Sequence, residues 1–248
     1  MIDINNKSFN FYNSNILIDN HLNLLKENEN IDIFTESIYV ISEKYIPFRE
    51  ENLFFNQFKN SILNFNNNKS KVFNKNFNTF SGIEFLFSEN SIKEKNSYIN
   101  FCLLDSNFLL IDLNNLKYSY EFLKKELSKI INNKVIPIIT HPERLAYQIE
   151  INNLKQLKDI GVLFQLSLAS LASNFGENIE KNSINLLQNG IFDFIASDTT
   201  NYSEFNNNFL EKILDKSRKL IGSASLDRLI YKNPSNIIDN KSSNNYQI

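Results

Sequence analysis

The stretch Val135-Ile-Pro-Ile-Ile-Thr-His-Pro-Glu-Arg144 decides the fold of this chain of 248 residues. Its first half, residues 135–139, is a short apolar run rich in β-branched side chains, and it follows the polar run 132–134. This pattern predicts a buried strand. The strand ends abruptly in a polar cluster, which consists of Thr140, His141, Glu143 and Arg144. Catalytic and binding groups gather where a buried parallel strand ends, because the scaffold is rigid there and the side chains face one crevice.

The same order of elements occurs twice more along the chain. Helical spacing over residues 154–160 leads through a glycine to a predicted strand at 162–167, and a helix ending at 184–189 leads through a glycine to a predicted strand at 191–196. Such alternation favours parallel strands joined by right-handed crossovers, whose carboxyl ends share one rim. The sequence therefore predicts a single polar site, to which the strand ends contribute His141, Gln165, Ser167 and Asp198.

The rest of the chain supplies further predicted elements. We expect strands at residues 2–4, 37–42, 79–87 and 108–113, and helices at 19–30, 49–65, 118–131, 205–220 and 226–231, the last one ended by Asn233-Pro234. About seven strands, each followed by a helix or an irregular segment, fit an α/β barrel of roughly 250 residues. We therefore expect one barrel domain over residues 1–240 and a loose C-terminal tail over 241–248.

Composition is that of an ordinary globular protein and excludes some function classes. Apolar residues make up 42% and charged residues 22%, and the formal net charge of −2 provides no field that favours nucleic acid or an anionic membrane. No apolar run is long enough to span a bilayer, and the N-terminus lacks the basic start and apolar core of a signal peptide. The one cysteine, Cys102, is expected to pack in the core, and the cytoplasm is the expected compartment.

One carboxylate stands inside a predicted strand. Glu84 lies between Ile83 and Phe85, where a buried strand would ordinarily stay apolar. A carboxylate in that position needs a cation or a metal ion to offset its desolvation. Glu84 is therefore a candidate metal ligand. By contrast, His21 has no other metal-type residue at helical spacing from it, so we expect a surface or capping residue there.

Several short motifs, taken in their order along the chain, resemble one known superfamily. The motifs are Met1-Ile-Asp-Ile4, Gly82-Ile-Glu84, Thr140-His-Pro-Glu-Arg144 and Ala196-Ser-Asp198. They resemble the polymerase-and-histidinol-phosphatase (PHP) superfamily. Within it, the run Leu163-Phe-Gln-Leu-Ser-Leu-Ala-Ser-Leu171 and the segment Lys232-Asn-Pro234 look most like the capsule-associated, metal-dependent protein-tyrosine phosphatases of the CpsB/YwqE type. The resemblance implies a distorted (β/α)7, TIM-like barrel with two or three manganese-like ions at the carboxyl ends of its strands.

The resemblance also implies roles for individual residues. The implied metal ligands are Glu84, His141 and Asp198, of which His141 and Asp198 also take part in catalysis. Arg144 would face the phosphate of the substrate. Glu43 falls near the position of a family histidine after the second strand and is a candidate fourth ligand. The implied partner is a phosphotyrosine protein, such as a bacterial tyrosine kinase, in the synthesis of capsular polysaccharide.

The chain departs from the family pattern at several ligand positions. The family opens with His-x-His after its first strand, where this chain has Asn5 and Lys7, and the late Asp-x-His of the family becomes Asp198-Thr-Thr200. A second arginine, which the family carries a few residues further on, has no counterpart here. The whole sequence contains 2 histidines, so no others are present to replace the lost ligands.

These losses leave two interpretations of the site open. Two-metal phosphoester hydrolysis needs ions about 3.5–4 Å apart, and holding them takes more ligands than remain here. In the first interpretation one divalent ion is held by the remaining candidates, which are Glu84, His141, Asp198 and Glu43, and still lowers the pKa of a bound water. In the second, the ammonium group of Lys7 balances the charge of the carboxylates in place of a lost ion, and no metal binds.

Two functions follow from these interpretations. The ligand count favours a catalytically impaired or inactive homologue that serves as a binding or regulatory module. The alternative is an active protein-tyrosine phosphatase that works with a reduced, one-metal site. Both interpretations share one condition. Four residues must converge at one mouth of the barrel, namely Lys7, Glu84, His141 and Asp198.

Overall fold

The structure is a computed structural model that describes residues 1–6, 36–42, 59–60, 63, 78–87, 101–113, 118–145, 149–198 and 207–239. Several sequence predictions concern residues outside these ranges. They are the helix at 19–30, most of the helix at 49–65, the tail at 241–248, and the roles given to Lys7, His21, Glu43 and Thr200. Asn5 belongs to the first strand of the sheet.

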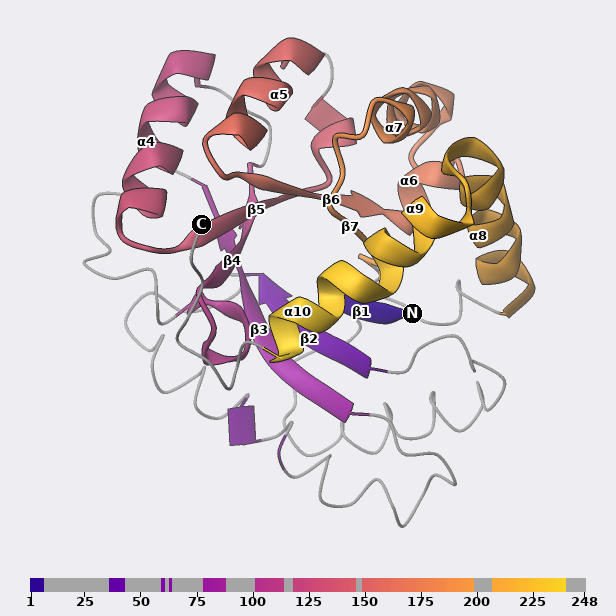
Figure 1. Ribbon diagram of the computed structural model, residues 1–248, viewed down its shortest axis with the longest axis horizontal. Coiled ribbons are helices and arrows are strands. Elements are labelled where there is room, and N and C mark those ends of the chain that lie inside the picture. Colours follow the sequence, from indigo (N-terminus) through magenta and orange to yellow (C-terminus); the bar gives the residue numbers. More distant parts are fainter. Residues whose placement is uncertain are drawn as a thin grey trace.

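Seven parallel strands form one sheet that curves into an incompletely closed barrel (Figure 1). They are β1 (Ile2–Asn6), β2 (Glu36–Ser42), β3 (Asn78–Leu86), β4 (Phe108–Asp112), β5 (Ile136–Thr140), β6 (Leu163–Ser167) and β7 (Phe194–Ala196). Their order in the sheet is their order in the sequence, and every neighbouring pair is parallel. β1 and β7 contact each other, but no hydrogen-bonded register joins the described residues of these two strands. The predicted single-domain, distorted (β/α)7 fold is confirmed.

Helices cover the outer face of this sheet. In chain order the described helical segments are η4 (Leu103–Asp105), α4 (Tyr120–Asn132), η5 (Pro142–Leu145), α5 (Ile151–Asp159), α6 (Leu168–Leu171), α7 (Glu177–Gln188), α8 (Asn207–Ile221), α9 (Ser223–Asp227), η7 (Arg228–Lys232) and α10 (Asn233–Asp239). Figure 1 shows α4, α5, α7 and α8 around the outside of the strands, as crossover connections between parallel strands require. Ser119 caps α4 by accepting a hydrogen bond from the N–H of Phe122.

Alternation along each strand divides the apolar side chains into two clusters. Every second side chain of a strand packs outward against the helices, and this set includes Ile83, Leu109, Ile139 and Ile195. The alternate set, here called the interior phase, fills the barrel interior and includes Ile4, Leu110, Ile138 and Phe194, and Ile237 of α10 packs against it. Because successive side chains of a strand face opposite sides, the interior phase continues to the carboxyl ends of the strands. There it meets polar residues, which are Glu84, Asp112, Thr140 and Ser167.

The C-terminal helices correct one prediction. The expected helix end at Asn233-Pro234 is wrong, because the chain stays helical through α9, the π-helical turn η7 and α10. Pro234 lies in the first turn of α10, where its missing N–H costs no intrahelical hydrogen bond. The wider π-helical turn directly before it accommodates the proline ring. Proline disrupts a helix in its interior and is favoured at its start, and here the second effect applies.

A half-buried ionic contact ties α5 to the beginnings of β6 and β7. Asp193 accepts a hydrogen bond from the N–H of Phe164 at 3.0 Å, and its other oxygen lies 2.8 Å from Nζ of Lys158. The same ammonium group donates to the carbonyl of Ile191 at 2.8 Å. Burial raises the pKa of the Asp193 carboxyl, and Lys158 opposes that effect. Asp193 directly precedes β7, so this contact fixes where the strand that leads to Asp198 begins.

Replacing Asp193 tests this contact. We expect Asp193→Ala to lower the free energy of unfolding by about 2–3 kcal/mol, because it leaves a half-buried ammonium group and a backbone N–H without their acceptor. The matched control is Asp215→Ala, which removes the carboxylate of the exposed ion pair with Arg218 and should cost about 0–1 kcal/mol. Urea unfolding followed by circular dichroism measures both. Equal losses of unfolding free energy in the two variants would contradict a stabilising role for the contact between Asp193 and Lys158.

Candidate metal and phosphate site

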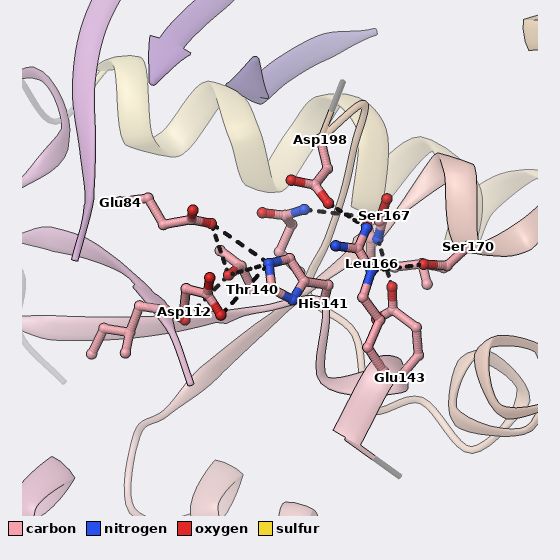
Figure 2. A network of polar contacts seen from close by, with 12 residues as sticks. Glu84, Asp112, Thr140, His141, Glu143, Leu166, Ser167, Ser170 and Asp198 are labelled. Atoms are coloured by element: carbon pink, nitrogen blue, oxygen red, sulfur yellow. Dashed lines mark hydrogen bonds and ion pairs between the residues drawn. The ribbon is translucent and has the colours of Figure 1, made fainter. Parts of the chain in front are cut away.

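The polar ends of five strands meet at one rim of the barrel (Figure 2). β3 contributes Glu84, β4 contributes Asp112, β5 contributes Thr140, β6 contributes Ser167, and Asp198 follows β7 by two positions. Glu84, Asp112, Thr140 and Ser167 continue the interior phase of their strands, so the register of the sheet directs these four to a common space. All but Asp112 are buried. The predicted convergence of Glu84, His141 and Asp198 at one mouth of the barrel is therefore present.

Two residues reach the rim through unusual backbone conformations. By alternation, His141 would face the helix layer, because Thr140 before it faces the interior. A φ of 39° turns the chain instead, and the N–H of His141 donates to the carbonyl of Gln165 at 2.9 Å. Asp198 has a φ of 52°. Left-handed conformations are costly for most residues other than glycine and recur at functional sites, so the contacts of the rim have to offset this cost at both residues.

One half of the rim is built around the imidazole of His141. Its Nε2 atom lies 3.8 Å from Oε1 of Glu84 and 3.9 Å from Oδ1 of Asp112. The hydroxyl of Thr140 bridges this group, since its Oγ1 atom lies 3.0 Å from Oε1 of Glu84 and 3.2 Å from Nε2 of His141. The side chain of Glu84 keeps 1% of its surface exposed. Thr140 therefore fixes the Glu84 carboxylate against the imidazole.

The other half is built around the guanidinium of Arg144. Nη2 of Arg144 lies 2.5 Å from Oδ2 of Asp198, and Nε lies 3.5 Å from Oγ of Ser170. The guanidinium carbon also lies 4.0 Å from the ring centroid of Phe175. These contacts hold the group at a fixed place and give Asp198 a cationic partner. From the sequence we expected Arg144 to face a phosphate and Lys7 to balance the charge of the carboxylates. In the structure Arg144 itself is paired with the Asp198 carboxylate.

Glu143 lies beneath the rim and is fully buried. Its Oε1 atom accepts a hydrogen bond from the backbone N–H of Ser167 at 3.3 Å, which ties η5 to the end of β6. Burial raises the pKa of the Glu143 carboxyl to about 7, although Arg144 and the hydroxyl of Ser170 lower it. Desolvation outweighs the nearby positive charge, so Glu143 is a structural carboxyl that stays protonated over much of the acidic range.

The donor set suits one divalent ion. One ligand atom from each of Glu84, His141 and Asp198 lies within 4.8 Å of the others. Ligand atoms bound at about 2.0–2.2 Å from a shared ion lie roughly 3–4 Å apart, so small side-chain movements bring this group into ligating geometry. A carboxylate has two oxygens, so Asp198 can bind an ion while it accepts from Arg144. An imidazole with two carboxylates is a chemically suitable set for manganese or zinc.

Sequence reasoning missed three residues at this rim. Asp112 ends a buried apolar strand just as Thr140 does, so applying the rule for polar strand ends to β4 would have found it. Ser170 and Phe175 follow β6, in and just after the short helix α6, which periodicity over four residues cannot reveal. Of the remaining candidates, Gln165 and Ser167 are buried at the rim, whereas Lys7, Glu43 and Thr200 lie outside the part of the chain that the structure describes.

The raised pKa of Glu143 makes stability depend on pH. Its pKa is about 7 in the folded protein, against the ordinary pKa of 4.5, so the folded state holds this proton more tightly and loses stability as the pH rises between these values. Relative to Glu143→Gln, the wild-type free energy of unfolding should fall by on the order of 3 kcal/mol from pH 4.5 to above 7, at about 1.36 kcal/mol per pKa unit. Denaturant unfolding across this range measures it. Glu177→Gln, at an exposed carboxyl of α7, is the control, and parallel profiles for wild type and Glu143→Gln would contradict the assignment.

Comparison with known sequences places the chain among capsule-synthesis proteins. The family described as capsular polysaccharide synthesis, CpsB/CapC, matches residues 28–239. The CapC protein of Staphylococcus aureus, described as a tyrosine-protein phosphatase, is 33% identical over 157 residues. That match covers 62% of this chain and 59% of the S. aureus protein, so the chain matches less than two thirds of the length of this relative.

Comparison with solved structures supports the same fold. The structure from a study of YwqE of Bacillus subtilis and CpsB of Streptococcus pneumoniae, which are metal-dependent tyrosine phosphatases, matches with a TM-score of 0.71 at 18% identity and covers 97% of this chain and 92% of that one. The phosphotriesterase homology protein of Escherichia coli, with phosphate in its active site, matches with a TM-score of 0.54 at 11% identity, covering 95% and 97%. A lactonase of Listeria monocytogenes matches with a TM-score of 0.52 at 8% identity, covering 94% and 93%.

These matches agree with the motifs and the rim. At such low identities the solved structures show the barrel architecture, and the family match over most of the chain shows the relationship. Among the described helices, none is both long and apolar enough to cross a membrane. The seven-stranded parallel sheet, the Thr140-His-Pro-Glu-Arg144 segment and the family match together lead to one conclusion: the chain belongs to the CpsB/CapC family of capsular polysaccharide synthesis proteins.

Proposed function

We propose that this chain recognises phosphotyrosine proteins of a capsular polysaccharide system, such as a tyrosine kinase in the cytoplasm, and that it hydrolyses the phosphoester slowly or not at all. The barrel, residues 1–240, is the functional unit in this proposal. The observation that carries it is the rim itself, where an anchored guanidinium lies beside a three-residue donor group that suits one ion. In this proposal the chain can still bind a phosphate, but it lacks the ligands that a second metal ion would need.

Arg144 supports the recognition part of the proposal. A guanidinium carries five N–H donors in a fixed fork that matches phosphate oxygens. Asp198, Ser170 and Phe175 hold this group in place, so little side-chain entropy is lost when a phosphate binds. A dianionic phosphate also outcompetes a single carboxylate for a guanidinium, because each hydrogen bond is made to a more highly charged acceptor. Asp198 engages Nη2 of Arg144, so the other N–H donors of the guanidinium can bind the phosphate while this anchor stays in place.

The ligand count supports the impaired turnover. In-line displacement at a phosphoester is fast when two ions stabilise the attacking and the leaving oxygen. The sequence has Asn5, Lys7 and Thr200 at the family's histidine positions. In the described part of the chain, one group of three donors comes together, which is sufficient for one ion. A single ion supplies Lewis-acid activation at one oxygen, and this chain's residues then orient the substrate without a second charge clamp.

A second candidate function is a phosphatase that works with one ion. The specific observation in its favour is that Glu84, His141 and Asp198 keep their mutual proximity within 4.8 Å. Asp112 adds a further carboxylate 3.9 Å from the imidazole of His141. In this function Thr140 would hold Glu84 in its ligating orientation, and Arg144 would bind the phosphate oxygens opposite the ion.

Removing Arg144 tests phosphate recognition. We expect Arg144→Ala to weaken binding of a fluorescently labelled phosphotyrosine peptide by about 10- to 100-fold, because one or two hydrogen bonds to a charged acceptor are worth about 1.5–3 kcal/mol. Arg144→Lys should retain part of the affinity, since it keeps the charge and loses the fork. Arg218→Ala removes an exposed arginine of α8 and serves as the matched control. Fluorescence anisotropy gives the affinities, and equal binding by Arg144→Ala and Arg218→Ala would refute the proposal.

Metal content and turnover separate the two candidate functions. We expect protein purified without chelator to carry at most one manganese, zinc or iron per chain, and His141→Ala to carry less than wild type. Replacing Asn5, Lys7 and Thr200 together by histidine should raise the metal content, because it restores family ligands. Phosphate release from a phosphotyrosine peptide should stay near background with added Mn²⁺. Release that depends on Mn²⁺ and is lost in His141→Ala would establish the one-ion phosphatase instead.

A further inference from the structure

An exposed phenyl ring stands over the guanidinium of Arg144. Phe175 keeps 46% of its surface exposed, and it is one of three large apolar residues in the described ranges that are exposed to this degree. Its ring centroid lies 4.0 Å from the guanidinium carbon. The other two, Leu63 and Tyr231, have no such contact with the residues of the rim. One of the exposed aromatic rings in the described ranges thus lies next to the group that binds a phosphate in our proposal.

The turn that carries Phe175 is firmly held. It follows α6 and precedes α7, and two left-handed residues shape it, Ser173 with a φ of 63° and Gly176 with a φ of 95°. Backbone hydrogen bonds close it: the N–H of Gly176 donates to the carbonyl of Ser173 at 2.9 Å, and the N–H of Asn174 donates to that of Ala169 at 3.2 Å. Gly176 permits the turn because a φ of that size is strained for any residue with a Cβ atom.

A side-chain network fastens this turn to α7 and α8. The hydroxyl of Ser173 donates to the carboxylate of Glu180, which also forms an ion pair with Lys216. The ammonium group of Lys216 donates in addition to the carbonyl of Leu171 at 2.8 Å. Three elements thus converge on the loop that presents one exposed phenylalanine. An exposed apolar ring held in a fixed place, with solvent on one side, is arranged to contact a ligand.

We propose that Phe175 is a specificity-determining residue that packs against the aromatic ring of a phosphotyrosine while Arg144 binds its phosphate. This inference rests on the proposed function and adds the reason why an aryl phosphate would be preferred over an alkyl phosphate. The ring of Phe175 orients the guanidinium with one part of its surface and offers its exposed part to the substrate. Phosphoserine has no ring to place there, so its complex lacks this contact.

The expected effect on affinity is moderate and selective. Offset or edge-to-face contacts between two aromatic rings contribute about 0.5–1.5 kcal/mol beyond area burial, which corresponds to about two- to tenfold in affinity. The wild-type chain should therefore bind a phosphotyrosine peptide more tightly than the same peptide with phosphoserine by at least this factor. Phe175→Ala should remove most of this preference, and Phe175→Leu, which keeps apolar bulk without a ring, should remove part of it. Tyr231→Ala, at another exposed aromatic residue, is the matched control and should leave the preference unchanged.

The experiment compares the wild type and three variants with three probes. Fluorescence anisotropy gives affinities for the two phosphopeptides, and competition with inorganic phosphate reports on Arg144 alone. The inference predicts that Phe175→Ala lowers the affinity for the phosphotyrosine peptide by about two- to tenfold more than the affinities for the phosphoserine peptide and inorganic phosphate, which lose only the contact that orients Arg144. An equal loss for all three probes would overturn it, since the ring would then act only by positioning Arg144. If neither peptide binds to the wild type, the proposed function and this inference are both overturned. If the wild type binds the two peptides with equal affinity, the inference alone is overturned.

Discussion

The common phase of the parallel strands is the constraint on which the site depends. Glu84, Asp112, Thr140 and Ser167 share the interior side of the barrel because each lies an even number of positions from an interior apolar residue of its own strand. A slip of one residue in β3 would turn Glu84 into the outer apolar layer, where Ile83 and Phe85 now pack. A carboxylate there would lose Thr140 and the imidazole, so the cost of its desolvation would be uncompensated. The apolar pattern that drives folding therefore also selects the register that assembles the site.

Reading the sequence was most successful where apolar periodicity was strong. The strands around 135–139 and 162–167 and the helix around 118–131 are present with shifts of one or two residues at their ends, because buried strands and amphipathic helices leave unambiguous patterns. The strand at 191–196 is shortened to Phe194–Ala196, whereas the helix expected to end at 184–189 is α7, Glu177–Gln188, whose start the sequence did not define. The polar first turns of α7 carry little periodicity. Proline at 234 was ambiguous for a different reason, since its effect depends on whether it lies inside or at the start of a helix.

The site was predictable in its membership and not in its pairing. The strand-end rule and the family resemblance together named Glu84, His141, Arg144 and Asp198, and all four lie at the rim. That Arg144 pairs with Asp198 does not follow from sequence, because it depends on the path of η5 relative to β7 in space. The place of Phe175 likewise depends on a turn closed by contacts to α7 and α8. Side chains that act across elements in this way leave no spacing in the sequence by which to recognise them.

The left-handed backbone at His141 and Asp198 has a consequence for the energetics of the rim. Each such residue costs on the order of 1 kcal/mol or more relative to glycine. Glycine at either position would relieve that cost, but it would also remove the ion pair of Asp198 with Arg144 or the contacts of the imidazole with Glu84 and Asp112. Local conformational energy and polar contacts between strands are therefore balanced against each other here, so a substitution at one end of either contact is felt in the backbone of the other.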